Sequence, residues 1–397
     1  MLARWRSLSP DLRLIYWTTV LAGLAHSAYD GLLAPFLREE GLAVEGVGLF
    51  YAATTAVGAA ASLGGGFLAD RVGARQVIVA GRAFNLIGLA LLLISRSPPF
   101  LALVALAWGL GLMTFPALSA LVARQTTPAN RATAFGLWDT LGAAAGTVAP
   151  PGGGFLADRF GPKAALLAGL PFAAASTLLA KNLRPDAPSG PAPAGAEPRG
   201  GSGSLLAIYR GKTARVAAGA SLLWFLCGVE MGLLRPVNSL LVVDNFGATW
   251  LSVGLVGTFS AIAAMAASLS GGILADRHGR FPVTLASFLF GSIAFTALPW
   301  APSLEAAYLG FFLVGLVITF NGPALSALTA EAVPAACRGR FLGLTSTLIM
   351  LGMMIGAAPA GVLYDLARWL PFAVAGLLEL TMAAIVWLAL RGQPACE

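Results

Sequence analysis

The stretch GGGFLADRVGAR at Gly64–Arg75 decides the fold, because close copies of it return as GGGFLADRFGPK at 152–163 and GGILADRHGR at 271–280. Each copy runs from glycines through apolar residues to an Asp-Arg pair and another glycine. Small residues allow close approach between helices, and the charged residues are typical of a loop. We interpret each copy as the junction between one helix and the next.

The composition indicates which solvent surrounds these helices. Of the 397 residues, 57% are hydrophobic and 11% are charged, against about 25% charged in soluble domains. A helix needs roughly 20 apolar residues to cross a bilayer, and twelve such runs predict an all-α membrane protein with twelve transmembrane helices embedded in the lipid bilayer. The runs begin near Leu14, Val47, Val77, Phe100, Ala132, Ala164, Ala214, Leu251, Pro282, Leu304, Phe341 and Leu370.

The basic residues predict the orientation of these helices. Eighteen lysines and arginines fall on one side, whereas the other side receives Arg38, Arg96, Arg159, Lys163 and Arg368. Because basic loops stay in the cytoplasm, we expect a multi-pass protein of the cell membrane with both termini cytoplasmic. The net charge of +7 therefore reflects topology, and we expect no nucleic-acid partner.

One long polar segment divides the chain. Residues 182–204 read NLRPDAPSGPAPAGAEPRGGSGS, a composition that cannot bury enough apolar surface to fold and is typical of a flexible linker. It predicts an N-terminal six-helix bundle at 1–180, a cytoplasmic linker at 181–212 and a C-terminal six-helix bundle at 213–397.

The two halves repeat each other. Asp70 and Asp276 lie 206 residues apart, Gly48 meets Gly254 at the same shift, and PALSAL occurs at 116–121 and at 323–328. A finer repeat places an aspartate at the end of the second, fifth, eighth and eleventh helices. Because these helices are three apart, successive copies run in opposite directions, which predicts inverted three-helix repeats within each half. The aspartates are Asp70, Asp158, Asp276 and Asp365.

These motifs carry a resemblance to a known family. GFLADRVGAR at 66–75 and GILADRHGR at 272–280 resemble the loop signature G-x-L-x-D-R-x-G-R-R of the major facilitator superfamily, in which two pseudo-symmetric six-helix bundles work by alternating access. The stretch at 136–154, GLWDTLGAAAGTVAPPGGG, partly resembles the fifth-helix signature of its antiporter members. The fourth-helix arginine of drug exporters is missing, which weakens that assignment.

The signature loop suggests a conformational latch. The carboxylate of Asp70 is suited to pair with an arginine, such as Arg124, or with the positive end of a helix dipole, and the resemblance suggests the eleventh helix. The alternative is that these charges only set the topology. The expected latch residues are Gly66, Asp70, Arg71, Gly73, Arg75, Arg124, Gly272, Asp276, Arg277, Gly279 and Arg280.

Ionisable residues inside the bilayer need a reason, because each costs roughly 2.5–3.5 kcal/mol at its centre. Asp30 and Glu230 are the leading candidates for carrying a proton or binding a cationic substrate. An ion pair between Asp30 and Arg235 is the structural alternative, and Arg235 is equally suited to bind an anion. We expect Arg82 to be structural and leave Asp139 and His26 open. The full candidate set is His26, Tyr29, Asp30, Arg82, Asp139, Glu230, Arg235 and Asn238.

The function that fits best is secondary active transport by alternating access. We expect proton-coupled efflux of lipophilic or cationic small molecules by a monomer; the alternative substrate is a small organic anion, a sugar or another metabolite. The chain shows no phosphate-binding loop and no catalytic motif, so we expect no enzyme. Its three cysteines show no framework spacing, and we expect neither a metal nor a cofactor.

Overall fold

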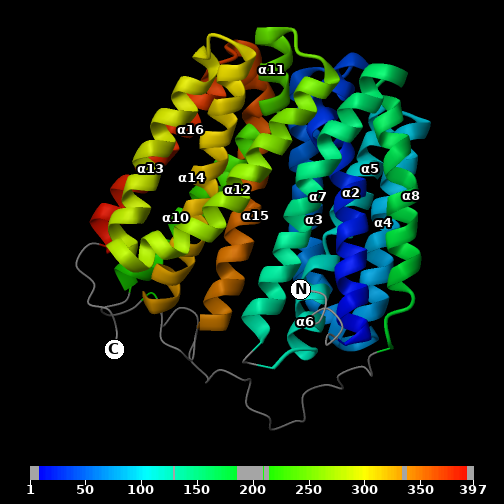
Figure 1. Ribbon diagram of the computed structural model, residues 1–397, viewed down its shortest axis with the longest axis horizontal. Coiled ribbons are helices and arrows are strands. Elements are labelled where there is room, and N and C mark those ends of the chain that lie inside the picture. The colour runs from blue at the N-terminus through cyan, green and yellow to red at the C-terminus, as the bar shows by residue number, and fades with distance from the viewer. Residues whose placement is uncertain (1–8, 128–129, 186–208, 210–213, 333–337, 391–397) are drawn as a thin grey trace. The chain divides into compact units, whose positions relative to one another are not determined.

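The computed structural model describes residues 9–127, 130–185, 209, 214–332 and 338–390, apart from some side chains. Its regular structure is helical, with no strand among the described residues (Figure 1). The helices are α2 (Pro10–Glu39), α3 (Val44–Val72), α4 (Ala74–Ile94), α5 (Pro98–Gly111), α6 (Thr114–Arg124), α7 (Arg131–Phe160), α8 (Lys163–Ala180), α10 (Ala214–Leu234), α11 (Asn238–Phe246), α12 (Trp250–His278), α13 (Arg280–Ala297), α14 (Leu304–Ala332), α15 (Arg338–Leu366) and α16 (Leu370–Ile385).

Membrane-spanning helices dominate the fold. Among the described residues, ten helices are long and apolar enough to cross a bilayer, which confirms a multi-pass helical protein. Two of these spans are interrupted: α5 and α6 together make one, and α10 and α11 make another. Of the remaining runs, α14 contributes a shorter apolar stretch, Leu304–Phe320, and α7 is rich in glycine and contains Pro150 and Pro151.

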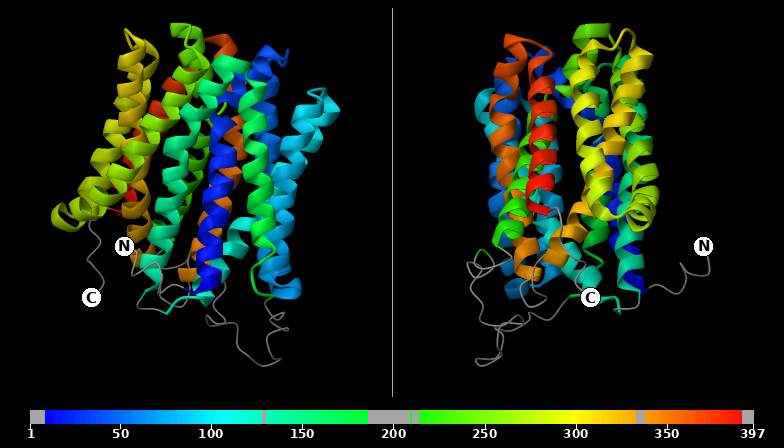
Figure 2. Two further views of the ribbon diagram at one scale, coloured as in Figure 1. Left: turned by 45° about the vertical axis from the view of Figure 1, so that its right-hand side comes forward. Right: turned by 90° about the vertical axis from the view of Figure 1, so that its left-hand side faces the viewer.

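The chain forms two compact units whose borders do not follow the sequence order. Unit 1 comprises Met1–Leu42, Ala53–Ala194 and Ala248–Thr258, and unit 2 comprises Ala43–Ala52, Gly195–Gly247 and Phe259–Glu397. The first turns of α12 therefore belong to unit 1, and the first turns of α3 belong to unit 2. In unit 1, α2 packs along α7 and α8 (Figure 1, Figure 2).

Glycines at equivalent repeat positions explain why the first turns of α3 belong to unit 2 and those of α12 to unit 1. In unit 2, a side chain at Gly48 would overlap the carbonyl oxygen of Ala357 on α15. In unit 1, a side chain at Gly254 would overlap the carbonyl oxygen of Pro150 on α7. Both glycines let backbones meet closely, and they are the pair that the sequence repeat aligns. The two contacts are thus counterparts.

Polar contacts tie together both ends of unit 1. At one end, the carboxylate of Glu40 forms ion pairs with Arg96 at 3.6 Å and with Lys163 at 3.2 Å, which join the loops after α2, α4 and α7. At the other end, the amide of Gln125 donates to Asp11 at 3.3 Å, and Arg184 lies 3.9 Å from the same carboxylate. Successive helices therefore run in opposite directions, as the assignment of loops to alternate sides requires.

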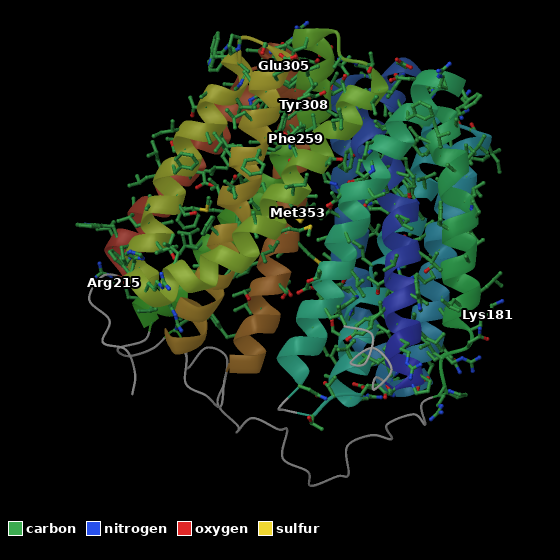
Figure 3. All side chains as sticks on the ribbon, viewed as in Figure 1. Lys181, Arg215, Phe259, Glu305, Tyr308 and Met353 are labelled. Atoms are coloured by element: carbon green, nitrogen blue, oxygen red, sulfur yellow. The ribbon has the colours of Figure 1, made fainter. Side chains whose placement is uncertain are left out.

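Unit 2 shows a similar tie at one of its ends. The hydroxyl of Tyr364 donates to the carboxylate of Asp244 at 2.9 Å, and Arg368 donates to the Asp244 carbonyl at 2.8 Å. Glu305, at the start of α14, lies at this end, and Arg215, at the start of α10, lies at the opposite end (Figure 3). Alternating helix directions thus hold here too.

The last glycine of each signature copy has a backbone reason. Gly73, Gly161 and Gly279 have φ angles of 96°, 85° and 87°, a region in which side chains are unfavourable. Each glycine sits between one helix and the next, where the backbone reverses within a residue or two. Asp70, Asp158 and Asp365 lie in the last turns of α3, α7 and α15, which confirms the helix ends that the sequence predicts.

A glycine seam joins α10 to α15 in unit 2. It consists of Gly228 and Gly232 on α10 with Gly352 and Gly356 on α15, each pair spaced as G-x-x-x-G. A side chain at Gly232 would overlap the carbonyl oxygen of Met353, which lies midway along α15 (Figure 3), and a side chain at Gly356 would overlap that of Val229. The backbones are therefore in direct contact, as small-residue motifs permit in membranes.

Candidate substrate and proton site

A cavity of about 450 Å³ lies inside unit 1. It is surrounded by α2, α4, the α5–α6 break, α7 and α8, so every wall comes from the N-terminal half of the sequence. The break occurs at Leu112 and Met113, between α5 and α6. The polar, ionisable and aromatic residues that line the cavity include Thr19, His26, Tyr29, Arg82, Asn85, Phe115, Trp138, Asp139 and Ser176.

Three aromatic side chains, Tyr29, Phe115 and Trp138, form part of the cavity wall. Tyr29 stacks on Trp108 with ring centroids 5.7 Å apart, and Phe115 stacks on Trp138 at 5.3 Å. The indole of Trp138 donates to the hydroxyl of Thr19 at 2.9 Å, so hydrogen bonding and stacking fix its orientation. Such a wall offers flat apolar surface to a lipophilic or aromatic molecule.

Ionisable groups interrupt this apolar wall. His26 Nε2 lies 3.4 Å from Asp30 Oδ1, one helical turn along α2, and their side chains are 51% and 32% exposed. Asp139 is also exposed and lines the cavity. The His26–Asp30 pair therefore combines a carboxylate and an imidazole at an accessible position, and both groups are able to exchange a proton.

Arg82 lines the same cavity, although the sequence favours a structural role for it. Its Nε atom is buried and finds no hydrogen-bond partner among the described residues. A buried guanidinium donor without a partner is costly. This position therefore also suits Arg82 to hydrogen-bond an acceptor that enters the cavity.

The remaining candidates lie in unit 2. The guanidinium of Arg235 sits 5.2 Å from the ring centre of Tyr51, a cation–π contact, and Asn238 begins α11 after the break between α10 and α11. Glu230 is buried, and its carboxyl group meets that of Glu379 on α16. Glu379 is absent from the sequence-based candidates, although a lone glutamate within an apolar run was a signal available there.

The latch residues are placed only in part. Arg124 Nη2 lies 3.5 Å from Asp70 Oδ1, and Arg75 donates to the carbonyl of Lys181 at 2.5 Å, at the end of α8 (Figure 3). Arg71 and Arg277 are exposed, Gly66 lies within α3, and Arg280 begins α13. The side-chain surroundings of Gly272 and Asp276 lie outside the described residues.

Asp158 is a second residue that the sequence-based candidates lack, and it caps a helix. Its two carboxylate oxygens accept the backbone N–H groups of Trp250 at 2.8 Å and Leu251 at 3.0 Å. These are orphan donors at the N-terminus of α12, where a negative charge also meets the positive end of the helix dipole. The second signature copy thus shows directly the interaction that we expected of Asp70.

Removing this cap should expose the start of α12. A lost N-cap costs about 0.5–2 kcal/mol, so Asp158→Ala should speed hydrogen exchange at Trp250 and Leu251 by roughly tenfold, since 1.4 kcal/mol is a factor of ten. Hydrogen-exchange mass spectrometry of the purified protein measures this. The control is Asp365→Ala in the equivalent copy, where the described residues show no such cap. If Trp250 and Leu251 exchange equally slowly in both variants, the prediction is wrong.

The spans and the cavity with its ionisable groups describe a multi-pass membrane transporter. The family model described as Major Facilitator Superfamily matches residues 15–231 and again 220–395, so the chain belongs to the major facilitator superfamily. It is a transporter and not an enzyme. This confirms the resemblance of the signature loops.

Several curated proteins are similar to this chain. Multidrug resistance protein MdtH of Aeromonas hydrophila is 29% identical over 328 residues, covering 80% of this chain and 79% of that protein. The niacin transporter NiaP of Acinetobacter baylyi is 30% identical over 169 residues, and the class H tetracycline resistance protein of Pasteurella multocida is 27% identical over 160. The latter two matches cover 41% and 39% of this chain but span only 37% and 39% of those proteins' lengths.

Solved structures share the fold. A bacterial homologue of the human lysosomal transporter Spinster, in an inward-facing and unoccupied conformation, has a TM-score of 0.76 at 15% identity, covering 96% of each chain. The human organic anion transporter MFSD10 has a TM-score of 0.67 at 20% identity, covering 95% of this chain and all of that one. At these identities the likeness concerns the fold alone.

Proposed function

We propose that this protein is a secondary active transporter that couples efflux of lipophilic or cationic small molecules to protons by alternating access. The observation that carries the proposal is the cavity of unit 1, which is lined by aromatic side chains and by His26, whose ring lies 3.4 Å from the carboxylate of Asp30. Aromatic surface binds lipophilic molecules, and a carboxylate attracts a cation or a proton. Relatives named for multidrug and tetracycline resistance support an efflux role.

The architecture that serves this function is also part of the proposal. It has twelve transmembrane helices in two pseudo-symmetric six-helix bundles, 1–180 and 213–397, joined by a cytoplasmic linker at 181–212. The bundles consist of inverted three-helix repeats, both termini are cytoplasmic, and the monomer resides in the cell membrane. The tandem matches of one family model support two related halves, and the alternating loop ties support the helix directions.

Charged helix ends are proposed to control the conformational cycle. Asp70 with Arg124 forms part of a latch on the cytoplasmic side, and the Asp158 cap on α12 is its counterpart on the other side. The exposed Asp70–Arg124 pair is worth at most about 1 kcal/mol, and the cap about 0.5–2 kcal/mol. Interactions this weak can break and form again during each transport cycle.

Transport by purified protein in liposomes tests the proposed function. Ethidium serves as a lipophilic cation and nicotinate as an organic anion, each followed with and without an imposed pH gradient. We expect the gradient to drive ethidium accumulation that collapses when a protonophore is added. Absence of any gradient-dependent accumulation of either probe would contradict proton-coupled transport.

Arg82 favours a second candidate function, transport of a small organic anion. The unpartnered Nε atom lies in the cavity, where a carboxylate would satisfy it through a charge-assisted hydrogen bond. In that case nicotinate accumulates in place of ethidium, and Arg82→Gln lowers nicotinate affinity by more than about tenfold, the cost of one such bond. Arg159→Gln, at an exposed position in the last turn of α7 outside the cavity lining, is the matched control. Ethidium transport with unchanged nicotinate affinity would exclude this candidate.

A further inference from the structure

Two glutamates meet in the interior of unit 2. Glu230 on α10 is 4% exposed and Glu379 on α16 is 1% exposed, and their carboxyl groups lie within hydrogen-bonding reach of each other. One turn away, Cys227 Sγ lies 3.5 Å from Met382 Sδ. The two contacts advance by three residues in opposite directions along α10 and α16, as expected for antiparallel helices. The meeting of the glutamates therefore follows from the helix register.

The neighbouring helix leaves space for this pair. Gly291 on α13 faces Glu379, and a Cβ atom added there would lie 2.6 Å from Glu379 Oε2. The side chain of Val317 on α14 closes the same site. Glycine therefore makes room for a carboxyl group that apolar surroundings would otherwise exclude.

No cation balances the pair among the described residues. Cys227 is the other titratable side chain beside it. Arg235, which directly follows α10, contacts the ring of Tyr51. Within α10 and α13–α16, all other charged residues lie in the first or last turns, far along the helices from the glutamates. These residues are Arg215, Arg280, Glu305, Glu331, Arg338, Arg340 and Asp365.

Two ionised carboxylates in contact are unfavourable in such a place. Each buried charge costs several kcal/mol in desolvation, and like charges at contact repel each other strongly. A proton held between the two oxygens removes one charge and forms a short, charge-assisted O–H···O⁻ bond. The remaining atoms, Glu230 Oε1 and Glu379 Oε2, are buried and find no hydrogen-bond partner among the described residues. A second proton, bound at one of these atoms, would neutralise the pair.

We propose that Glu230 and Glu379 form a proton-binding pair that takes up one proton and releases it again in each transport cycle. The pair alternates between a singly protonated state with one negative charge and a doubly protonated neutral state. This inference rests on the proposed proton coupling and assigns it a site in unit 2, separate from the His26–Asp30 pair. Glu379 is the residue that makes Glu230 a shared site rather than a lone acid.

Infrared spectroscopy of the purified protein tests whether the pair holds a proton. At neutral pH the wild type should show a carboxylic-acid C=O stretching band, shifted in heavy water, that is lost in the Glu230→Gln/Glu379→Gln double variant. Glu305→Gln, which changes an exposed glutamate at the start of α14, should retain it. A wild type without the band, or a double variant that keeps it at full intensity, would overturn the proposal; the wild-type measurement stands even where a variant fails to fold.

Transport in liposomes tests whether the proton moves. Without a gradient, Glu379→Gln should still exchange ethidium or nicotinate, whichever the wild type accumulates, across the membrane. With a gradient of one pH unit, its accumulation ratio should be about tenfold lower than that of the wild type. A variant that accumulates the probe as the wild type does would overturn the pair and leave proton coupling intact. A wild type whose accumulation does not depend on the pH gradient would overturn both the proton-binding pair and proton coupling.

Discussion

Gly232→Ala is expected to destabilise this protein strongly, although it adds a single methyl group. The new Cβ atom would overlap the backbone carbonyl oxygen of Met353, and a backbone atom is unable to rotate away as a side chain does. Overpacking of this kind costs about 1–3 kcal/mol and occasionally more. Because the glycine seam joins α10 to α15 along several turns, separating the helices there would also disturb Gly228 and Gly356.

The control is the same change at a position with free space. Gly31→Ala also lies within a helix, but an added Cβ meets nothing within 4 Å, so the higher helix propensity of alanine, about 1 kcal/mol, should preserve or raise stability. Thermal unfolding of both variants in detergent, followed by loss of monodisperse protein, should show opposite signs. Equal melting temperatures would show that α10 and α15 are not in the contact that the structure places there.

Asp30→Asn is expected to lower proton-driven accumulation of the substrate by about tenfold per unit of pH gradient. A gradient of one pH unit is worth about 1.4 kcal/mol per coupled proton, which supports roughly tenfold accumulation. Asparagine keeps the size of aspartate but carries no exchangeable charge, and it leaves His26 without its anionic neighbour at 3.4 Å. The variant should therefore bind the probe and equilibrate it, but lose the roughly tenfold accumulation that a proton carried by Asp30 supports.

Glu45→Gln provides the matched control for this experiment. Glu45 is an exposed carboxylate in the first turn of α3, so its neutralisation should leave the accumulation ratio unchanged. Accumulation is measured as the internal to external concentration of ethidium or nicotinate in liposomes with an imposed gradient. If Asp30→Asn concentrates the probe as well as Glu45→Gln does, Asp30 carries no coupled proton.

Local rules made much of the fold predictable. Apolar runs of membrane-spanning length fixed where the helices lie, and the aspartates of the signature copies marked helix ends that the structure confirms. Interruptions of helices were harder to foresee. The break at Leu112 and Met113 does have local signals, since Gly109 and Gly111 precede it and Pro116 lacks the N–H that would donate to the carbonyl of Leu112. The continuous apolar run nevertheless favours one unbroken helix.

The candidate site was less predictable, because it depends on contacts between distant segments. Glu230 and Glu379 are 149 positions apart in the sequence, and only the register of α10 against α16 brings them together. From the sequence, Asp158 is only one of the repeated aspartates at helix ends; its role as a cap appears once the structure places the N-terminus of α12 beside it. Arg82 shows the same limit, since a sequence reveals which helix carries a residue but not the cavity that its side chain reaches.

The polar ties at both ends of unit 1 have a mechanical consequence. Glu40 joins three loops at one end, and Asp11 joins the start of α2 to Gln125 and Arg184 at the other. A helix held at both ends is unable to slide alone, so a push on one is shared by its neighbours. Strain that a bound molecule creates in the cavity should therefore reach the rims as a tilt of the whole group rather than fade within it.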